Sequence, residues 1–157
     1  MIEVSRTLSV NDGAEPVLRV DDVWAGLVDK AENPLTYVSS MSECTVTERF
    51  DGGLVREVVH VGQPVREVVT FYPKKRVHFV RTHGTARGTI DNEIGLGDAG
   101  ELTLTFSFRI VVDGVEPGGA EEKEFASHME ADYLDAVRTT LKAVRGRVAG
   151  AATGISV

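Results

Sequence analysis

The sequence predicts an α+β fold in which a seven-stranded antiparallel sheet wraps around one long C-terminal helix. Three observations support this prediction: a first strand precedes a short helical segment around Trp24, a run of alternating strands follows, and the period becomes helical after Gly119. Alternation of apolar and polar residues is typical of a strand, and recurrence at three and four residues is typical of a helix. A curved sheet around one helix tends to leave a cavity, so this order of segments favours the binding of a small molecule.

Seven segments show the two-residue alternation of antiparallel strands. The clearest is residues 101–112, in which five apolar side chains from Leu102 to Ile110 share one face and Thr, Ser and Arg side chains share the other. This alternation defines which face of the sheet is wet. The predicted strands are residues 2–10, 43–50, 54–61, 65–72, 76–83, 87–94 and 101–112.

The first helix is predicted over residues 20–31, where apolar side chains recur at three- and four-residue spacing. Asp21 and Asp22 lie in its first turn, where carboxylates oppose the positive end of the helix dipole. Pro34 ends the helix. A short second helix or turn is expected over residues 35–41.

The last helix is predicted over residues ~120–148, on the 3.6-residue period of an apolar stripe that runs from Phe125 to Val148. Glutamates crowd its start, whereas arginine and lysine crowd its end, and this gradient complements the helix dipole. We therefore expect residues 1–149 to form a single ligand-binding domain and residues 150–157 to form a flexible tail.

The composition argues against several classes of function. The net charge of −7 and the pI of about 5.1 do not suit nucleic acid as a partner, because phosphate binding needs a concentrated basic surface. The one cysteine, Cys44, excludes an internal disulfide and a multi-cysteine metal site. Since the four histidines form no pair at helical metal-ligand spacing and there is no glycine-rich phosphate loop, we predict neither a metal nor a cofactor.

The chain also carries no sign of export or of a membrane span. Its first residues lack the basic-then-apolar pattern of a signal peptide. No stretch approaches the ~20 apolar residues that cross a bilayer. We therefore expect a cytoplasmic protein, and the sequence leaves a homodimer open.

The order of the motifs resembles the START/Bet v 1-like (SRPBCC) superfamily, and within it the AtaL-like group of unknown function. The resemblance spans nearly the whole chain. It implies the helix-grip fold and a site for hydrophobic molecules between the sheet and the last helix. One departure is Arg19, where a helix-capping Ser or Thr would be usual. The motifs are Val-Trp-Ala-Gly-Leu at 23–27, Asn-Pro at 33–34, Leu-Val-Arg-Glu at 54–57, Pro-Val-Arg-Glu at 64–67 and Leu-Thr-Leu-Thr-Phe at 102–106.

A polar cluster is predicted inside the sheet from the phase of one hairpin. A three-residue loop at 62–64 would place Glu57 and Glu67 on an otherwise apolar inner face, with Arg81 on the next strand. Burial raises a carboxylate pKa and a nearby arginine lowers it, so such a carboxylate could act as a general base or orient a carbonyl ligand. The alternatives are a structural ion pair, or glutamates at the open rim that reach water. A bulge in either strand would reverse the phase and remove the cluster.

Three functions are compatible with this pattern. The first is a carrier or sensor for a small hydrophobic or aromatic molecule, the second is a polyketide cyclase or aromatase-like enzyme with the same cavity, and the third is a chaperone-assisting interaction domain. Whether the protein is an enzyme stays undecided, because no catalytic signature is present. The residues expected to line the ligand site are Trp24, Tyr37, Glu57, Glu67, Phe71, Phe79, Arg81, Phe106, Phe108, Met129 and Tyr133.

Overall fold

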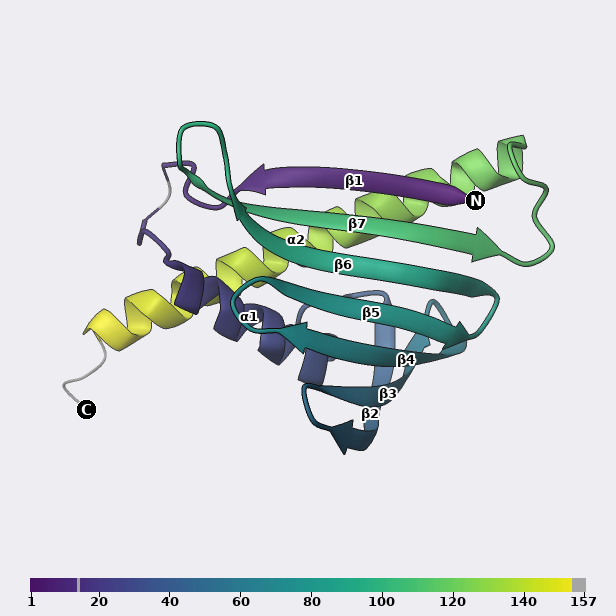
Figure 1. The fold of residues 1–157 in the computed structure, drawn as a ribbon, viewed down its shortest axis with the longest axis horizontal. Helices are drawn as coiled ribbons and strands as arrows, with labels where there is room; N and C mark the ends of the chain where they lie inside the picture. Colours follow the sequence, from purple (N-terminus) through teal and green to yellow (C-terminus); the bar gives the residue numbers. More distant parts are fainter. Residues whose placement is uncertain (14, 154–157) are drawn as a thin grey trace.

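The computed structural model describes residues 1–13 and 15–153, with side chains to Ala151. This part of the chain contains seven strands, two α-helices and one short 3-10 helix (Figure 1). In chain order they are β1 (Ile2–Ser9), α1 (Val20–Glu32), η1 (Pro34–Thr36), β2 (Met41–Phe50), β3 (Gly53–His60), β4 (Gln63–Tyr72), β5 (Arg76–His83), β6 (Ala86–Leu96), β7 (Leu102–Val112) and α2 (Ala120–Thr153).

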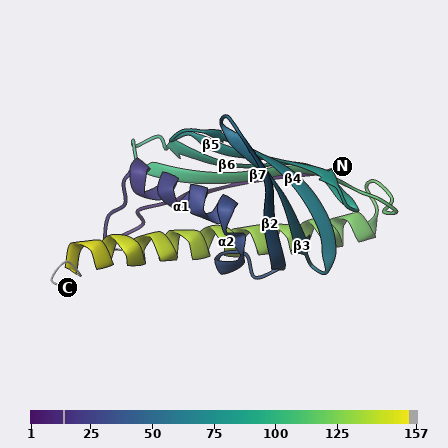
Figure 2. The same cartoon turned by 90° about the horizontal axis from the view of Figure 1, so that it is seen from below.

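The strands form one sheet in the order β1-β7-β6-β5-β4-β3-β2, and each neighbouring pair is antiparallel. The first and last strands of the chain therefore pair, as Val4 does with Phe108. In Figure 2, α2 runs along one side of the sheet, α1 lies between α2 and part of the sheet, and β2 to β4 curve towards α2. The predicted seven-stranded antiparallel sheet with a long C-terminal helix is confirmed.

The main core lies between the sheet and the two helices. Phe106 and Phe108 of β7 are each 1% exposed, whereas Thr105 and Ser107, which alternate with them, are partly exposed. The wet and dry faces of this strand are those that the alternation predicts. The ring of Phe108 meets Tyr133 of α2 edge to face, with 4.9 Å between centroids, which is a favourable aromatic geometry.

The helix ends have local explanations. α1 begins at Val20 although Arg19 precedes it, because the backbone N–H of Arg19 donates to Oδ2 of Asp22 at 2.9 Å. This is one half of a capping box. α2 begins where the sequence predicts but continues to Thr153, so its predicted end near residue 148 is too early. The remainder of the predicted tail, residues 154–157, lies outside the described residues.

The hairpin between β3 and β4 differs from the prediction in its loop. The loop has two residues, Val61 and Gly62, whose φ angles of 50° and 75° are both positive, as in type I′ turns. The sequence favours a three-residue loop at 62–64 over this two-residue loop, because a β-branched residue such as Val61 rarely adopts a positive φ. The backbone N–H of Val61 donates to the carbonyl of Ser40 at 2.8 Å, which helps to hold this conformation.

The shorter loop reverses the predicted phase of β3. Glu57 pairs with Arg66 and is exposed, whereas Arg56 stands opposite Glu67 and is 3% exposed. The prediction that Glu57 faces the interior is therefore wrong. An arginine takes its place, because a shift of one residue moves every side chain of a strand to the other face.

Candidate functional site

A row of three charged side chains crosses the inner face of β3, β4 and β5. Arg56, Glu67 and Arg81 stand opposite one another in the strand pairing, and each side chain is at most 4% exposed. Oε1 of Glu67 accepts from Nε and Nη2 of Arg56 at 2.9 and 2.7 Å, and Oε2 accepts from Nε of Arg81 at 2.8 Å. Nη1 of Arg56 also donates to the carbonyl of Ala31 at 2.7 Å, which ties the end of α1 to the sheet.

The carboxyl group of Glu67 is held in its charged form. Burial alone would raise its pKa, but the charges of Arg56 and Arg81, together with their hydrogen bonds, lower the pKa to about 2. A carboxylate with this pKa is a poor proton acceptor near neutral pH. Since both of its oxygens already accept hydrogen bonds from arginine, the chemistry available to Glu67 is to position two guanidinium groups.

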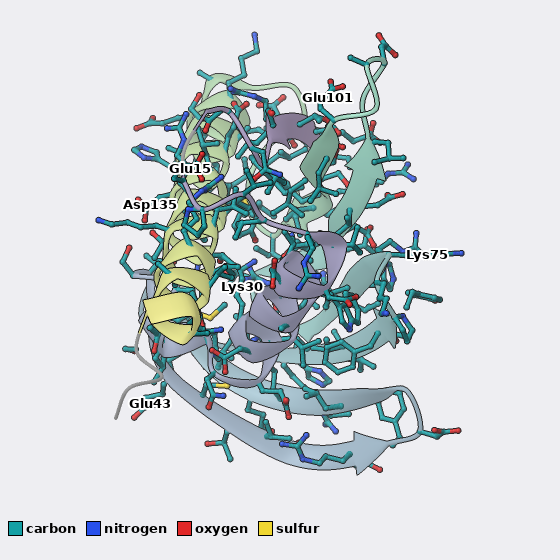
Figure 3. All side chains as sticks on the ribbon, turned by 90° about the vertical axis from the view of Figure 1, so that its left-hand side faces the viewer. Glu15, Lys30, Glu43, Lys75, Glu101 and Asp135 are labelled. Carbon is teal, nitrogen blue, oxygen red and sulfur yellow. The ribbon has the colours of Figure 1, made fainter. Side chains whose placement is uncertain are left out.

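A fourth charged side chain reaches the same cluster from α1. Nζ of Lys30 donates to Oδ1 of Asn92 on β6 at 2.7 Å. Burial, followed by the charge of Arg56, lowers the pKa of Lys30 to about 8. Figure 3 shows Lys30 near the centre of the molecule and Lys75 at its outer edge. Lys30 is half-buried, whereas Lys75 is exposed.

A small inner pocket of about 30 Å³ lies between this cluster and α2. Among the described residues, Nη2 of Arg81 and the hydroxyl of Tyr133 are buried there without a hydrogen-bond partner. Burial raises the pKa of Tyr133 to about 12, so its hydroxyl stays a donor at neutral pH. Buried polar atoms nearly always have partners, so these two donors mark a place for a ligand atom or a water. The pocket is lined by Lys30, Pro34, Val38, Met41, Arg56, Glu67, Phe79, Arg81, Ile90, Asn92, Phe106, Tyr133, Ala136 and Val137.

An outer pocket of about 480 Å³ lies between the first half of α2 and the ends of β3 to β6. Much of its wall is apolar, with Val65 and Ala86 from the sheet and Phe125 and Met129 from the helix. Arg81 lines both the outer and the inner pocket. Its guanidinium group therefore marks the boundary between a larger apolar space and a small polar one.

A histidine and an aspartate share the wall of the outer pocket. Nε2 of His60 lies 3.1 Å from Oδ2 of Asp132, which also accepts from the hydroxyl of Ser40 at 2.7 Å. Burial would raise the pKa of Asp132, but the hydrogen bonds from His60 and Ser40 outweigh it and lower the pKa. A histidine oriented by a carboxylate in this way is suited to acid–base chemistry.

A third hollow is a groove of about 950 Å³ along β2, β3 and β4. Glu57 lines this groove together with Glu43, Thr45 and Arg66. The groove is open and more polar than the outer pocket, so it surrounds a ligand less completely. Small-molecule sites are mostly concave and apolar with few polar groups, and the outer pocket fits that description better.

The residues predicted to line the ligand site fall into three groups. Trp24, Tyr37, Phe71 and Phe108 line neither the inner nor the outer pocket; Trp24 and Phe71, for example, meet edge to face with 6.3 Å between centroids. Glu57 lies in the groove on the other side. The remaining six, Glu67, Phe79, Arg81, Phe106, Met129 and Tyr133, line the inner or the outer pocket, and their role in ligand binding stays a prediction.

Sequence reasoning missed Lys30, Arg56, Asn92, His60 and Asp132. The three-residue loop at 62–64 that puts Glu57 on the inner face also puts Arg56 and His60 on the opposite, wet face. Lys30 stands three residues after buried Leu27, a spacing that puts it on the apolar face of α1. Asn92 stands two residues after buried Ile90 on β6, and this two-residue spacing predicts that Asn92 shares the inner face with Ile90.

The comparisons with known proteins agree with this architecture. The profile of the AtaL family, described as acetylaranotin biosynthesis cluster protein L, matches residues 4–150. Comparison with the curated proteins gives no significant match. No helix among residues 1–13 and 15–153 combines the length and apolar character needed to cross a membrane.

Several solved structures share the fold at low sequence identity. The di-domain aromatase/cyclase StfQ of the steffimycin biosynthetic pathway has a TM-score of 0.70 at 15% identity, over 95% of this chain and 52% of its own. The Zhui aromatase/cyclase from a Streptomyces species has a TM-score of 0.62 at 18% identity, over 94% of this chain and 93% of its own. A START superfamily protein from Mycobacterium smegmatis has a TM-score of 0.61 at 15% identity, over 94% of this chain and 97% of its own. These likenesses show the helix-grip fold. The family profile, which matches residues 4–150, shows that the chain belongs to the AtaL family.

Proposed function

We propose that the protein binds a small hydrophobic or aromatic molecule in the outer pocket, between the sheet and α2. The pocket volume of about 480 Å³ falls in the range of roughly 300–1,000 Å³ that is usual for small-molecule sites. The observation that carries the proposal is Nη2 of Arg81, a buried donor without a partner in the described structure, on a side chain that lines this pocket. A ligand oxygen at that point would satisfy it.

Neutral Nile red is a suitable probe because its fluorescence rises in an apolar site and its binding does not depend on charge. We expect saturable binding of one dye per chain to the native protein. Ala86→Trp fills the outer pocket from β6 and should abolish the saturable signal, and Ala86→Leu should weaken it. A melting curve for each variant shows whether it is folded.

The matched control is Thr45→Trp, which adds the same indole to the open groove on the other side. It should leave Nile red binding unchanged. Dye binding that survives Ala86→Trp, or that disappears in Thr45→Trp instead, would place the ligand in the groove and contradict the proposal. A native protein that binds no dye would also contradict it.

The second candidate is an enzyme that uses the same pocket, and the observation that favours it is the pair formed by His60 and Asp132. When Nε2 of His60 donates to Asp132, Nδ1 keeps its lone pair and is the available base. Such a base would take a proton from the carbon next to a ketone, while Arg81 would stabilise the resulting enolate oxygen. Two of the solved structures that share this fold are named aromatase/cyclases, and cyclisation of a polyketide-like substrate would begin with such a step.

Proton exchange tests this candidate without knowledge of the substrate. 1-Phenylbutane-1,3-dione in D₂O should exchange its central CH₂ hydrogens faster with the protein than with buffer, as followed by NMR. His60→Gln should reduce the acceleration to that of buffer, and His128→Gln, at an exposed histidine on the same pocket rim, should not. Equal rates for the native protein and His60→Gln would remove the enzyme candidate.

The third candidate, an interaction domain, needs a contiguous exposed apolar patch. Exposed large apolar side chains in the described part of the chain instead lie on separate segments, such as Val17 before α1, Phe50 at the end of β2 and Leu96 at the end of β6. This distribution does not support the interaction domain.

A further inference from the structure

The inner pocket has an excess of positive charge. Lys30, Arg56 and Arg81 converge on it from α1, β3 and β5, and one carboxylate, Glu67, faces them from β4. Both oxygens of Glu67 are occupied by the two arginines. The next carboxylate, Asp132 on α2, lies on the wall of the outer pocket and accepts from His60 and Ser40.

Two buried polar atoms on the wall of the inner pocket are unpartnered in the described structure, and both can donate a hydrogen bond. Nη2 of Arg81 and the hydroxyl of Tyr133 have no partner among the described residues. The hydrogen bond from Lys30 to Asn92 uses one of the three protons on Nζ. A group that enters this pocket therefore meets donors and net positive charge, which together favour an acceptor with negative charge.

The size of the inner pocket suits a small head group and no more. Its volume of about 30 Å³ exceeds the roughly 10–15 Å³ that one water needs, so it has room for a group of two or three heavy atoms. A carboxylate has three heavy atoms. The rest of a ligand must then lie in the outer pocket, which Arg81 joins to the inner one.

We propose that the inner pocket is a carboxylate-binding subsite, in which Nη2 of Arg81 and the hydroxyl of Tyr133 donate to the acid head of an amphiphilic ligand while Lys30 adds positive charge. The proposal rests on the proposed function, because the apolar body of the same ligand occupies the outer pocket. It narrows the ligand class to small hydrophobic or aromatic acids. Glu67 contributes by holding the side chain of Arg81 in place.

Decanoate and 1-decanol test the subsite because they share one chain and differ in the head group. Isothermal titration at pH 7 should show decanoate binding at least about tenfold more tightly than decanol, since hydrogen bonds to a charged acceptor are roughly twice as strong as neutral ones. Equal affinity, or tighter binding of decanol, would show a subsite occupied by water and would overturn the proposal.

Two variants locate the preference in the inner pocket. Tyr133→Phe removes the unpartnered hydroxyl and keeps the ring against Phe108, and Lys30→Met removes the charge while keeping much of the apolar stem. Each substitution should lower the affinity for decanoate by about three- to tenfold and change the affinity for decanol by less than twofold. Lys75→Met, at an exposed lysine, is the control and should change neither. If the ratio of decanoate affinity to decanol affinity is unchanged in both variants, the proposed subsite is wrong.

The pH dependence separates Lys30 from the arginines. Burial and the charge of Arg56 lower the pKa of Lys30 to about 8, so its positive charge is lost as the pH rises from 7 to 9.5. The other groups that face it keep their charge state in this window, because the pKa of Glu67 is about 2, that of Tyr133 is about 12 and that of Asp132 is lowered. Decanoate affinity should fall severalfold over the window in the native protein and stay level in Lys30→Met.

Failure of the subsite and failure of the proposed function give different results. If Nile red binds but decanoate shows no advantage over decanol, the subsite is wrong and the pocket remains a site for neutral molecules. If Nile red, decanol and decanoate all fail to bind, the proposed function is wrong as well. A decanoate preference that persists at pH 9.5 in the native protein, and in Lys30→Met and Tyr133→Phe, would place the acid head elsewhere.

Discussion

Glu67 shows why a buried carboxylate in a cavity need not be the reactive group. Each of its oxygens already accepts from an arginine. Arg56 also donates to the carbonyl of Ala31 in α1, and Arg81 lines both pockets. Removing one member of such a cluster leaves an uncompensated buried charge, which is far more costly than losing an exposed pair. We therefore expect Glu67 to be essential for stability and to act on a ligand only through Arg81.

Glu67→Gln should lower the free energy of unfolding by about 3–5 kcal/mol near neutral pH. The folded-state pKa of about 2 lies below the ordinary 4.5, so the stabilisation is present above about 4.5 and is lost as the pH falls towards 2. The difference between native protein and variant should therefore shrink from pH 6 to pH 2.5. Urea unfolding across this range measures it.

Glu57→Gln is the matched control, because Glu57 is an exposed glutamate on the neighbouring strand. It should change the free energy of unfolding by no more than about 0.5 kcal/mol. Comparable losses of unfolding free energy in the two variants would show that burial in the charged row does not make Glu67 more important for stability than an exposed glutamate. Intact Nile red binding by the folded fraction of Glu67→Gln would agree with a structural role, and lost binding without lost stability would contradict it.

The sequence predicts Glu67 and Arg81 correctly as interior residues and fails at their third partner. The phases of β4 and β5 follow from their own apolar neighbours, such as Val69 and Phe79. The phase of β3 depends instead on how many residues form its loop, and this number rests on the positive φ of Val61. No local preference of valine indicates that conformation, so the arginine opposite Glu67 was not predictable from the pattern.

At the scale of elements, the packing of α1 on α2 depends on Gly26. A Cβ atom added there would lie 2.3 Å from Cγ2 of Val144, whereas at Gly146 of α2 it would meet nothing within 4 Å. The two helices therefore approach each other at a residue without a side chain. The sequence places both glycines inside helical patterns but gives no sign of which one is in contact.

Gly26→Ala should lower the free energy of unfolding by about 1–2 kcal/mol, because overpacking outweighs the gain in helix propensity. Gly146→Ala should instead raise it by about 0.5–1 kcal/mol, since only the propensity changes. Val144→Ala should relieve the Gly26→Ala clash, so that the double variant loses less than the sum of the two. Thermal or urea unfolding of the native protein and the four variants checks this, and additivity of Gly26→Ala and Val144→Ala would show that the helices do not meet there.

At the scale of the whole molecule, the chain order is enough to predict the layers but not the division of the space between them. The two periodicities fix which elements are strands and which face of each is apolar. Pocket volumes depend on how side chains fill the interior, and Phe71 and Phe108, expected at the ligand, pack into the core. The polar inner pocket exists because charged groups from β3, β4, β5 and α1 meet there.

The two halves of α2 differ in what supports them, and this difference predicts how the molecule responds to a ligand. Phe125, Met129 and Asp132 in the first half line the outer pocket, whereas Val144 in the second half packs against α1 at Gly26. A segment over an unfilled pocket has fewer packed contacts, so it opens more readily than one in a solid core. Without ligand, amide hydrogens of residues 125–132 should exchange faster than those of residues 138–144.

Saturation with decanoate should slow exchange in residues 125–132 and leave residues 138–144 unchanged within error, because only the first half gains contacts from the ligand. Mass spectrometry of exchanged peptides measures both segments in one sample, and Ala86→Trp should show the slowed pattern without any ligand. Equal protection along the whole helix before and after ligand would show that α2 responds as one rigid element. In that case the pocket is not bounded by a separately mobile half-helix, and entry of the ligand must involve the β3–β4 or β5–β6 ends that form the rest of its rim.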